Sequence, residues 1–215
     1  MNEIGGRNRM ISAATVKELR ERTGAGMMDC KKALAATDGD MEKAIDFLRE
    51  KGLAAAAKKS GRIAAEGLVN IVLSDGAKEA AIVEVNAETD FVAKNAEFVE
   101  FVDNIANIVL ANDCADVEAL SKVAYGEEGT VDDAFKAKIA KIGENMSIRR
   151  FVKFANPNAV YASYTHGNGK IGVVVEFETA AATDEIAEMG RSVAMQVASM
   201  NPQFVDENEV DPEYI

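Results

Sequence analysis

The chain has 215 residues, of which 48% are hydrophobic and 28% charged, as expected for a folded protein with one or two domains. It carries 24 basic and 36 acidic residues, and its formal net charge at pH 7 is −12. This balance argues against a protein that binds duplex DNA or ribosomal RNA, because such a protein needs a basic face to replace counterions around phosphates.

The charge is unevenly distributed along the chain. Residues 12–62 contain 11 basic and 8 acidic residues, whereas residues 63–215 contain 11 basic and 27 acidic residues. The change of sign near residue 62 predicts a domain boundary there.

The cysteine content and the apolar runs indicate a cytoplasmic protein. Cys30 and Cys114 are too few and too far apart for a disulfide framework or a zinc site, so we expect two free thiols in a reducing compartment. No apolar run approaches the ~18 residues that span a membrane. The first residues lack the apolar segment of a signal peptide, and residues 1–11 are expected to form a disordered leader.

The residues that could support catalysis or nucleotide binding are sparse. His166 is the only histidine, and neither a nucleophile elbow nor a second metal ligand lies near it in the sequence. The run Gly167–Lys170 is followed by an apolar strand pattern, whereas a phosphate loop is followed by a helix. We therefore predict no enzyme, no cofactor and no bound metal, and a function that is exerted on a partner.

Three short helices are predicted at the N-terminus. The first spans Ala13–Thr23, the second runs from about Met27 to Thr37, and the third begins after Asp40, which is a good N-cap. In the second helix, the side chains expected on the buried face are Met27, Cys30, Ala33 and Leu34. Three helices in about 40 residues resemble a ubiquitin-associated domain.

Beyond residue 67 the pattern changes to alternation, which predicts strands. Residues 68–73 and 80–85 form a predicted hairpin, and a helix from Asn95 to about Asn112 follows it. Its expected buried side chains are Phe98, Phe101, Val102, Ile105 and Val109.

The hairpin-plus-helix pattern then recurs. An extra strand at 148–154 precedes strands at 160–165 and 171–177, and Asp184 caps a helix. The expected buried side chains of this helix are Ile186, Met189, Val193, Val197 and Met200. The spacing of the two copies indicates an internal duplication.

These patterns predict an α+β protein, with a ubiquitin-associated-like three-helix module followed by a duplicated hairpin-plus-helix core. The expected divisions are a leader (1–11), the three-helix domain (12–53), a linker (54–67), core subdomain N (68–147), core subdomain C (148–205) and an acidic tail (206–215).

Two segments place apolar residues where a core does not obviously need them. In Thr23–Lys32, Met28 falls about 100° around the helix from Met27. It either fills gaps in a loose core or belongs to a contact surface that carries methionine. In Asn86–Asn95, Phe91 either packs as a hydrophobic staple at the helix entry or projects as a wedge into a partner.

Within these segments, Thr23–Lys32 and Thr89–Asn95 resemble signature segments of bacterial elongation factor Ts. The stretches Lys141–Arg150 and Tyr164–Val173 resemble its remaining signatures, so four motifs match in order between Ile11 and about Val205. Longer members of that family continue past the position of Val205 into a coiled-coil insertion and a C-terminal module.

The resemblance implies a guanine-nucleotide exchange factor that binds elongation factor Tu in its GDP-bound and nucleotide-free states. The family segment that enters beside the partner's nucleotide site and displaces Mg²⁺ corresponds to Thr89, Asp90, Phe91 and Val92. The family positions that dock on the GTPase domain of the partner correspond to Arg20, Met27 and Met28. A position that contacts another domain of the partner corresponds to His166.

The resemblance implies no direct contact with nucleic acid or membrane. A homodimer is among the expectations, because short forms are similar to members that act as homodimers. Two other interpretations remain open at this point. One is a general adaptor that recruits partners through residues 12–52 without exchange activity, and the other is an enzyme that uses Cys30 activated by Lys31 and Lys32.

Overall fold

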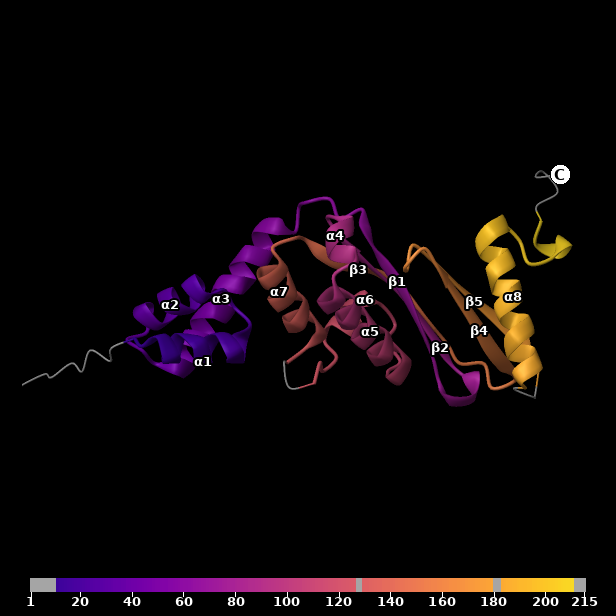
Figure 1. Cartoon of the computed structure of the whole chain (residues 1–215). Coiled ribbons are helices and arrows are strands. Elements are labelled where there is room, and N and C mark those ends of the chain that lie inside the picture. The colour runs from indigo at the N-terminus through magenta and orange to yellow at the C-terminus, as the bar shows by residue number, and fades with distance from the viewer. Residues whose placement is uncertain (1–10, 127–128, 180–182, 211–215) are drawn as a thin grey trace, which may run out of the picture. The chain divides into compact units, whose positions relative to one another are not determined.

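The computed structural model describes residues 11–126, 129–179 and 183–210 (Figure 1). Its contacts divide the chain into two compact units. The first combines Met1–Ile63 with Ala124–Met146, and the second combines Ala64–Val123 with Ser147–Ile215. Helices and antiparallel hairpins both occur, which confirms the predicted α+β class.

The first unit begins with three helices, α1 (Ala13–Thr23), α2 (Met27–Ala36) and α3 (Met41–Lys59). Side chains cap the N-termini of α1 and α3: the Ser12 hydroxyl accepts a hydrogen bond from the Thr15 amide, and Asp40 accepts one from the Lys43 amide. Their shared core consists of Val16, Leu19, Cys30, Ala33, Leu34 and Ala44.

The predicted position of Met27 is wrong. Its side chain is 46% exposed, while Cys30, Ala33 and Leu34 are buried as expected. Met27 is the first residue of α2 and follows Gly26, so no side chain of a preceding helical turn covers it. Both methionines of this segment are therefore exposed.

Helix α3 continues to Lys59, so residues 54–59 at the start of the expected linker are helical. Its second half packs against α7 (Val131–Ile142). The contact is close, because a Cβ added to Gly52 would lie 3.2 Å from the Cβ of Ala140. This packing draws 124–146 into the first unit, whereas the sequence prediction kept all of 68–147 in one subdomain.

The second unit contains a sheet of β1 (Glu66–Leu73), β2 (Ala80–Ala87) and β3 (Met146–Phe154), in that order. Helix α5 (Ala96–Ala111) packs on β1 and β2. All the apolar side chains predicted for its inner face are buried, and they form the main core of this unit with those of β2. The two short helices α4 (Asp90–Ala93) and α6 (Val117–Ser121) flank α5 in the sequence.

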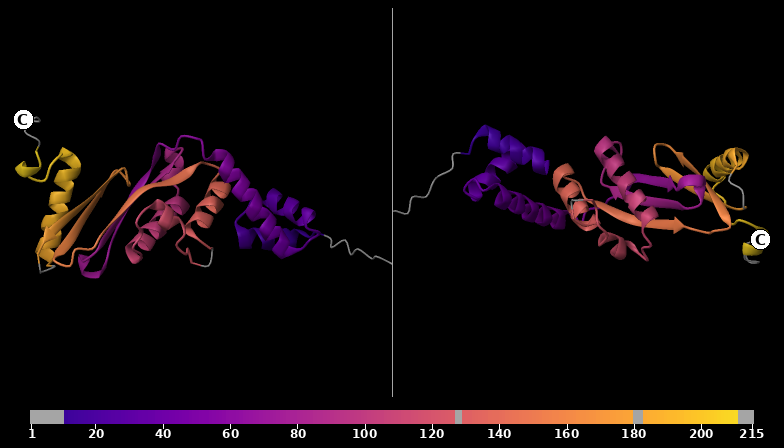
Figure 2. Two further views of the ribbon diagram at one scale, coloured as in Figure 1. Left: turned by 180° about the vertical axis from the view of Figure 1, so that it is seen from behind. Right: turned by 90° about the horizontal axis from the view of Figure 1, so that it is seen from below.

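A second hairpin, β4 (Ala159–His166) with β5 (Ile171–Glu178), lies between the first sheet and α8 (Asp184–Met200), as Figures 1 and 2 show. Tyr161 and Ala159 pack towards Ala80 of the first sheet. Each hairpin is followed by a helix, as the duplication predicts. Strand β3, expected to precede the second copy, instead joins the first sheet beside β2.

The predicted buried face of α8 is only partly right: Ile186 and Val197 are half-buried, whereas Val193 is exposed. Met189 and Met200 are 50% and 68% exposed, and the side of the helix that is buried carries Gly190 and Ala194. The physical reason is the short distance between α8 and the hairpin. A Cβ added to Gly190 would lie 2.5 Å from the Cβ of Ala162 and 2.8 Å from the Phe177 ring. Only small residues fit at this contact.

Because of this contact, a substitution that usually stabilises a helix should here lower the free energy of unfolding. Gly→Ala inside a helix normally stabilises by about 0.5–1 kcal/mol, but Gly190→Ala forces overlap with Ala162 and Phe177. We expect a net loss of about 1–2 kcal/mol in the free energy of unfolding, measured by urea denaturation. Ser192→Ala, at an exposed position of the same helix, is the control and should change stability little.

Candidate protein-interaction site

Helix α4 is a single turn held at both ends. The Thr89 hydroxyl accepts a hydrogen bond from the Val92 amide, and the Lys94 amide donates to the carbonyl oxygens of Asp90 and Val92. The turn continues into α5, where Asn95 caps the next helix by accepting from the Glu97 amide. The backbone of this connection is thus specified residue by residue, although it is short.

Neighbouring residues of the turn differ strongly in how far their side chains are exposed. Val92 and Ala93 are 8% and 6% exposed, and they anchor the turn where it packs on β1 and β2. Phe91, between Asp90 and Val92, is 82% exposed. A staple at the helix entry would bury this ring, so the staple interpretation is wrong and the projecting arrangement is the one observed.

An ion pair accompanies the exposed ring. The Lys94 Nζ donates to Asp90 Oδ2 at 2.6 Å, one helical turn apart. The hydrogen bond and the charge of Lys94 lower the pKa of the Asp90 carboxyl, and a smaller effect comes from Lys170. The same hydrogen bond raises the pKa of the Lys94 ammonium, with a smaller effect of Glu66.

His166 ends β4, at the turn that leads into β5, and its side chain is exposed. Its Nδ1 lies 2.9 Å from the hydroxyl of Tyr164, and the Arg191 guanidinium lies 5.9 Å from the centre of the Tyr164 ring. In the same turn, Lys170 forms an ion pair with Glu66. Glu66 is the first residue of β1, the strand on which α4 also packs, so the turn and α4 both contact this strand.

The predicted contact residues of the first unit are all on its surface. Arg20 is exposed on α1, and Met28 is 61% exposed at the start of α2. The adjacent Asp29 accepts a hydrogen bond from Lys51 of α3 at 2.6 Å. Met28 therefore projects from a point where α2 is tied to α3, and it does not fill the core.

The sequence did not predict that Glu66 and Lys170 pair close to the candidate site. Neither residue belongs to an apolar pattern or a recognisable motif, and the two are 104 positions apart. Their meeting depends on how the second hairpin packs on β1, which periodicity within single elements does not reveal. The only signal in the sequence was the position of Lys170 within the last signature segment, Tyr164–Val173.

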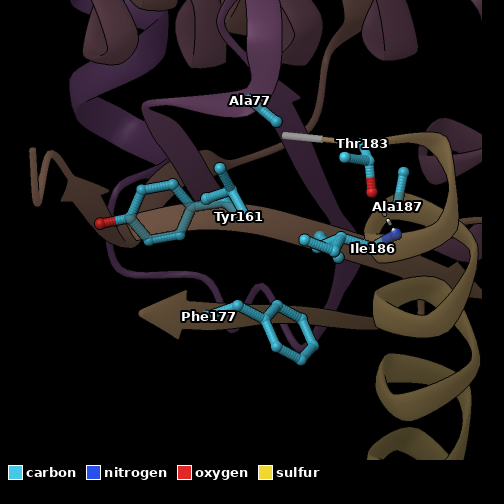
Figure 3. Close-up of a pocket in the computed structure, with 8 residues that line it drawn as sticks. Ala77, Tyr161, Phe177, Thr183, Ile186 and Ala187 are labelled. Atoms are coloured by element: carbon cyan, nitrogen blue, oxygen red, sulfur yellow. Dashed lines mark hydrogen bonds between the residues drawn. The ribbon is translucent and has the colours of Figure 1, made fainter. Parts of the chain in front are cut away.

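Two further observations bear on enzymatic interpretations. A cavity between η1 (Asp75–Ala77), the second hairpin and the start of α8 has a volume of about 30 Å³, room for one or two water molecules (Figure 3). Its lining is apolar, and the Thr183 hydroxyl in its wall accepts from the Ile186 amide. Cys30 is fully buried, with its thiol 3.7 Å from the Ala25 carbonyl oxygen, which removes the support for a reactive cysteine.

Within the part of the chain that the structure describes, no helix is both long and apolar enough to cross a membrane. The described residues also contain no group of three His, Cys, Asp or Glu side chains placed to share a metal ion.

The exposed Phe91 ring, on a capped turn that is anchored to an α+β scaffold, makes this surface a candidate for contact with a partner. The elongation factor TS family model matches residues 88–215. The chain is 54% identical over 206 residues to elongation factor Ts of Clostridium botulinum (strain Eklund 17B / Type B), an alignment that covers 96% of this chain and 68% of that protein.

Elongation factor Ts of Clostridium novyi (strain NT) is 58% identical over 206 residues, with 95% of this chain and 67% of that protein covered. The protein of the same name from Clostridioides difficile (strain 630) is 55% identical over 205 residues, with 95% and 67% covered. The chain belongs to the elongation factor Ts family, and the resemblance seen in its four motifs is confirmed. It is a translation elongation factor.

The Asp90–Lys94 pair predicts a measurable pH effect. Because the folded-state pKa of Asp90 is lowered, the stabilisation is present above the ordinary carboxyl pKa of about 4 and is lost as pH falls through the lowered value. We expect Lys94→Met to raise the pKa of Asp90 towards its ordinary value, measured by NMR titration of the carboxyl carbon. Lys122→Met is the control, and an unchanged Asp90 pKa in Lys94→Met would contradict the assignment.

Proposed function

We propose that this protein binds elongation factor Tu in its GDP-bound and nucleotide-free states and promotes the release of GDP. The observation that carries the proposal is the exposed ring of Phe91 on a turn whose backbone is capped and anchored. A large aromatic side chain that is already exposed on a fixed backbone can be buried in a partner's pocket without rearrangement of this chain, which is the way aromatic hot spots act at interfaces.

In this proposal Thr89, Asp90, Phe91 and Val92 act beside the partner's nucleotide site, where they displace Mg²⁺. The ion bridges the phosphates and neutralises their charge, so its loss weakens nucleotide retention. Burial of the Phe91 ring contributes about 1.5–3 kcal/mol, which supports an arrangement of the partner that has lost the metal. Val92 and Thr89 hold the turn, and Phe91 and Asp90 face outward.

Arg20, Met27 and Met28 are proposed to dock on the GTPase domain of the partner, and His166 on another of its domains. Exposed methionines suit this role because their flexible thioether chains adapt to an apolar surface. These contacts supply affinity, whereas the α4 turn changes the nucleotide site. As a translation factor the protein would act in the cytoplasm.

The adaptor interpretation remains the second candidate, and the exposed Met27 and Met28 on the three-helix part favour it. It differs in one testable respect, because an adaptor binds without altering nucleotide affinity. The test is release of a fluorescent GDP analogue from elongation factor Tu, with and without the full chain, at several Mg²⁺ concentrations. We expect strong acceleration that diminishes as Mg²⁺ rises, while binding without acceleration would support the adaptor.

Substitution of Phe91 should separate exchange from binding. We expect Phe91→Ala to slow catalysed GDP release by about 10- to 100-fold, since the burial of its ring is lost, and to weaken complex formation much less. The melting temperature should be unchanged, because the ring is exposed in the free protein. Val152→Ala, which truncates another exposed apolar side chain, is the matched control. Equal losses of rate and affinity in Phe91→Ala would contradict the wedge.

Substitution of Met28 should have the converse effect. We expect Met28→Ala to weaken the affinity for elongation factor Tu by several-fold, through loss of apolar contact area. The GDP release rate at saturating concentrations should stay close to that of the unaltered chain. Titration calorimetry and the same fluorescence assay measure the two quantities, and Met189→Ala controls for the loss of any exposed methionine.

A further inference from the structure

We infer that Glu66 and Lys170 are positioning residues for Phe91. Their ion pair holds the turn between β4 and β5 against the strand end that leads into α4, and it thereby fixes the direction in which the ring projects. The inference rests on the proposed exchange function and deepens it, because it connects the proposed contact at His166 with the proposed wedge.

The turn between β4 and β5 packs directly on β1. The Val69 amide donates a hydrogen bond to the Gly169 carbonyl oxygen at 2.7 Å. A Cβ added to Gly169, whose φ is +86°, would lie 2.8 Å from the Cβ of Leu68, and one added to Gly172 would lie 2.5 Å from Val69 Cγ1. The turn therefore approaches the backbone of β1 at Gly169, and the start of β5 packs at Gly172 on the Val69 side chain.

A second connection runs from the turn to α4. Lys170 pairs with Glu66, the first residue of β1. Glu66 stands opposite Ala87, the last residue of β2, and its carbonyl oxygen accepts a hydrogen bond from the Asn86 side chain at 3.0 Å. Only one residue separates Ala87 from Thr89, the N-cap of α4. A force on Glu66 thus acts on the end of the strand from which the turn that carries Phe91 begins.

A third connection is electrostatic. Lys170 contributes to the lowered pKa of Asp90, and Glu66 contributes to the raised pKa of Lys94, although in both cases the Asp90–Lys94 hydrogen bond is the largest cause. Glu66 and Lys170 therefore act through their charges on the Asp90–Lys94 pair of α4.

The expected size of the effect follows from exposure. Glu66 and Lys170 are 41% and 48% exposed, and an ion pair of this kind changes an equilibrium by about 1.4- to 5-fold. That is too little to decide whether the unit folds. It is enough to shift how α4 sits on the sheet, because a four-residue helix, although capped at both ends, is positioned by its contacts with β1 and β2. High salt should weaken the effect.

The test compares the full chain with Glu66→Gln, Lys170→Met and the double variant. We expect each single variant to lower the maximal rate of GDP release from the partner by about two- to fivefold, with a smaller change in the affinity of the complex. The double variant should lose little more than either single one, because both remove the same pair. Rates equal to that of the unaltered chain in all three would overturn the inference.

A charge exchange separates positioning from a merely structural role. The variant with Glu66→Lys and Lys170→Glu restores the pair itself, so thermal stability should return to that of the unaltered chain. However, it reverses the sign of the charges that act from positions 66 and 170 on Lys94 and Asp90. We therefore expect the release rate to stay low. If the exchange restores the rate along with the stability, the pair only holds the fold together and the inference is wrong.

The matched control is the same exchange in the Glu118–Lys122 pair of α6, whose atoms are 2.8 Å apart and which is also exposed. It should change neither rate nor stability. The ring resonances of Phe91 in the chain alone give a readout that needs no partner, and they should shift in Lys170→Met but not in Lys122→Met. Shifted resonances with no acceleration by the unaltered chain would overturn the exchange function and still support the positioning of Phe91.

Discussion

Close approach of backbones around the second hairpin is the constraint on which the second unit depends. Gly169 and Gly172 let the hairpin rest directly on β1, and Gly190 lets α8 rest on its other face. A side chain at any of these positions would overlap with its neighbours by several tenths of an ångström or more. Because the hairpin is fixed from both sides, its turn is held beside the strand end that precedes α4. The arrangement of the candidate site thus follows from packing some distance away from Phe91.

The ring of Phe91 is kept exposed by the other residues of the turn between Thr89 and Lys94, which have separate roles. Val92 and Ala93 are buried and contribute the stabilising contacts, while the hydroxyl of Thr89 and the amide of Lys94 complete the hydrogen bonds of the turn. Phe91 itself contributes almost nothing to the folded state of the free protein. Folding does not require the Phe91 ring, but it fixes the backbone that carries the ring. Phe91 is therefore available for contact with a partner in a defined orientation.

The sequence predicted elements well where one face is buried by large side chains, and less well where packing selects small ones. The five apolar residues of α5 are buried as its periodicity indicates, because that helix packs on a sheet with room for them. In α8 the prediction was right for the half-buried Ile186 and Val197 and wrong for Met189, Val193 and Met200, since the residues at the closest contact are the small Gly190 and Ala194. The packing of α7 on α3 and the pairing of Glu66 with Lys170 join distant segments, and local patterns carry no information about either. Of the candidate site, motif resemblance supplied the residues, and only the structure supplied the contacts that hold them.

The proposed contact residues fall into both compact units, with Arg20, Met27 and Met28 in the first and the α4 turn and His166 in the second. Thermodynamic linkage between GDP binding and complex formation shows how the two groups of contacts can differ in effect. A contact that is equally strong with the GDP-bound and the nucleotide-free partner adds affinity and leaves nucleotide release unchanged. A contact that is stronger in the nucleotide-free state lowers the affinity for GDP by the same factor by which GDP weakens the complex. Exposed methionines can adapt to either state of a surface, whereas a ring on a rigid turn fits only one arrangement of its surroundings. Adaptable residues therefore suit the part that binds, and a fixed aromatic residue suits the part that distinguishes the two states.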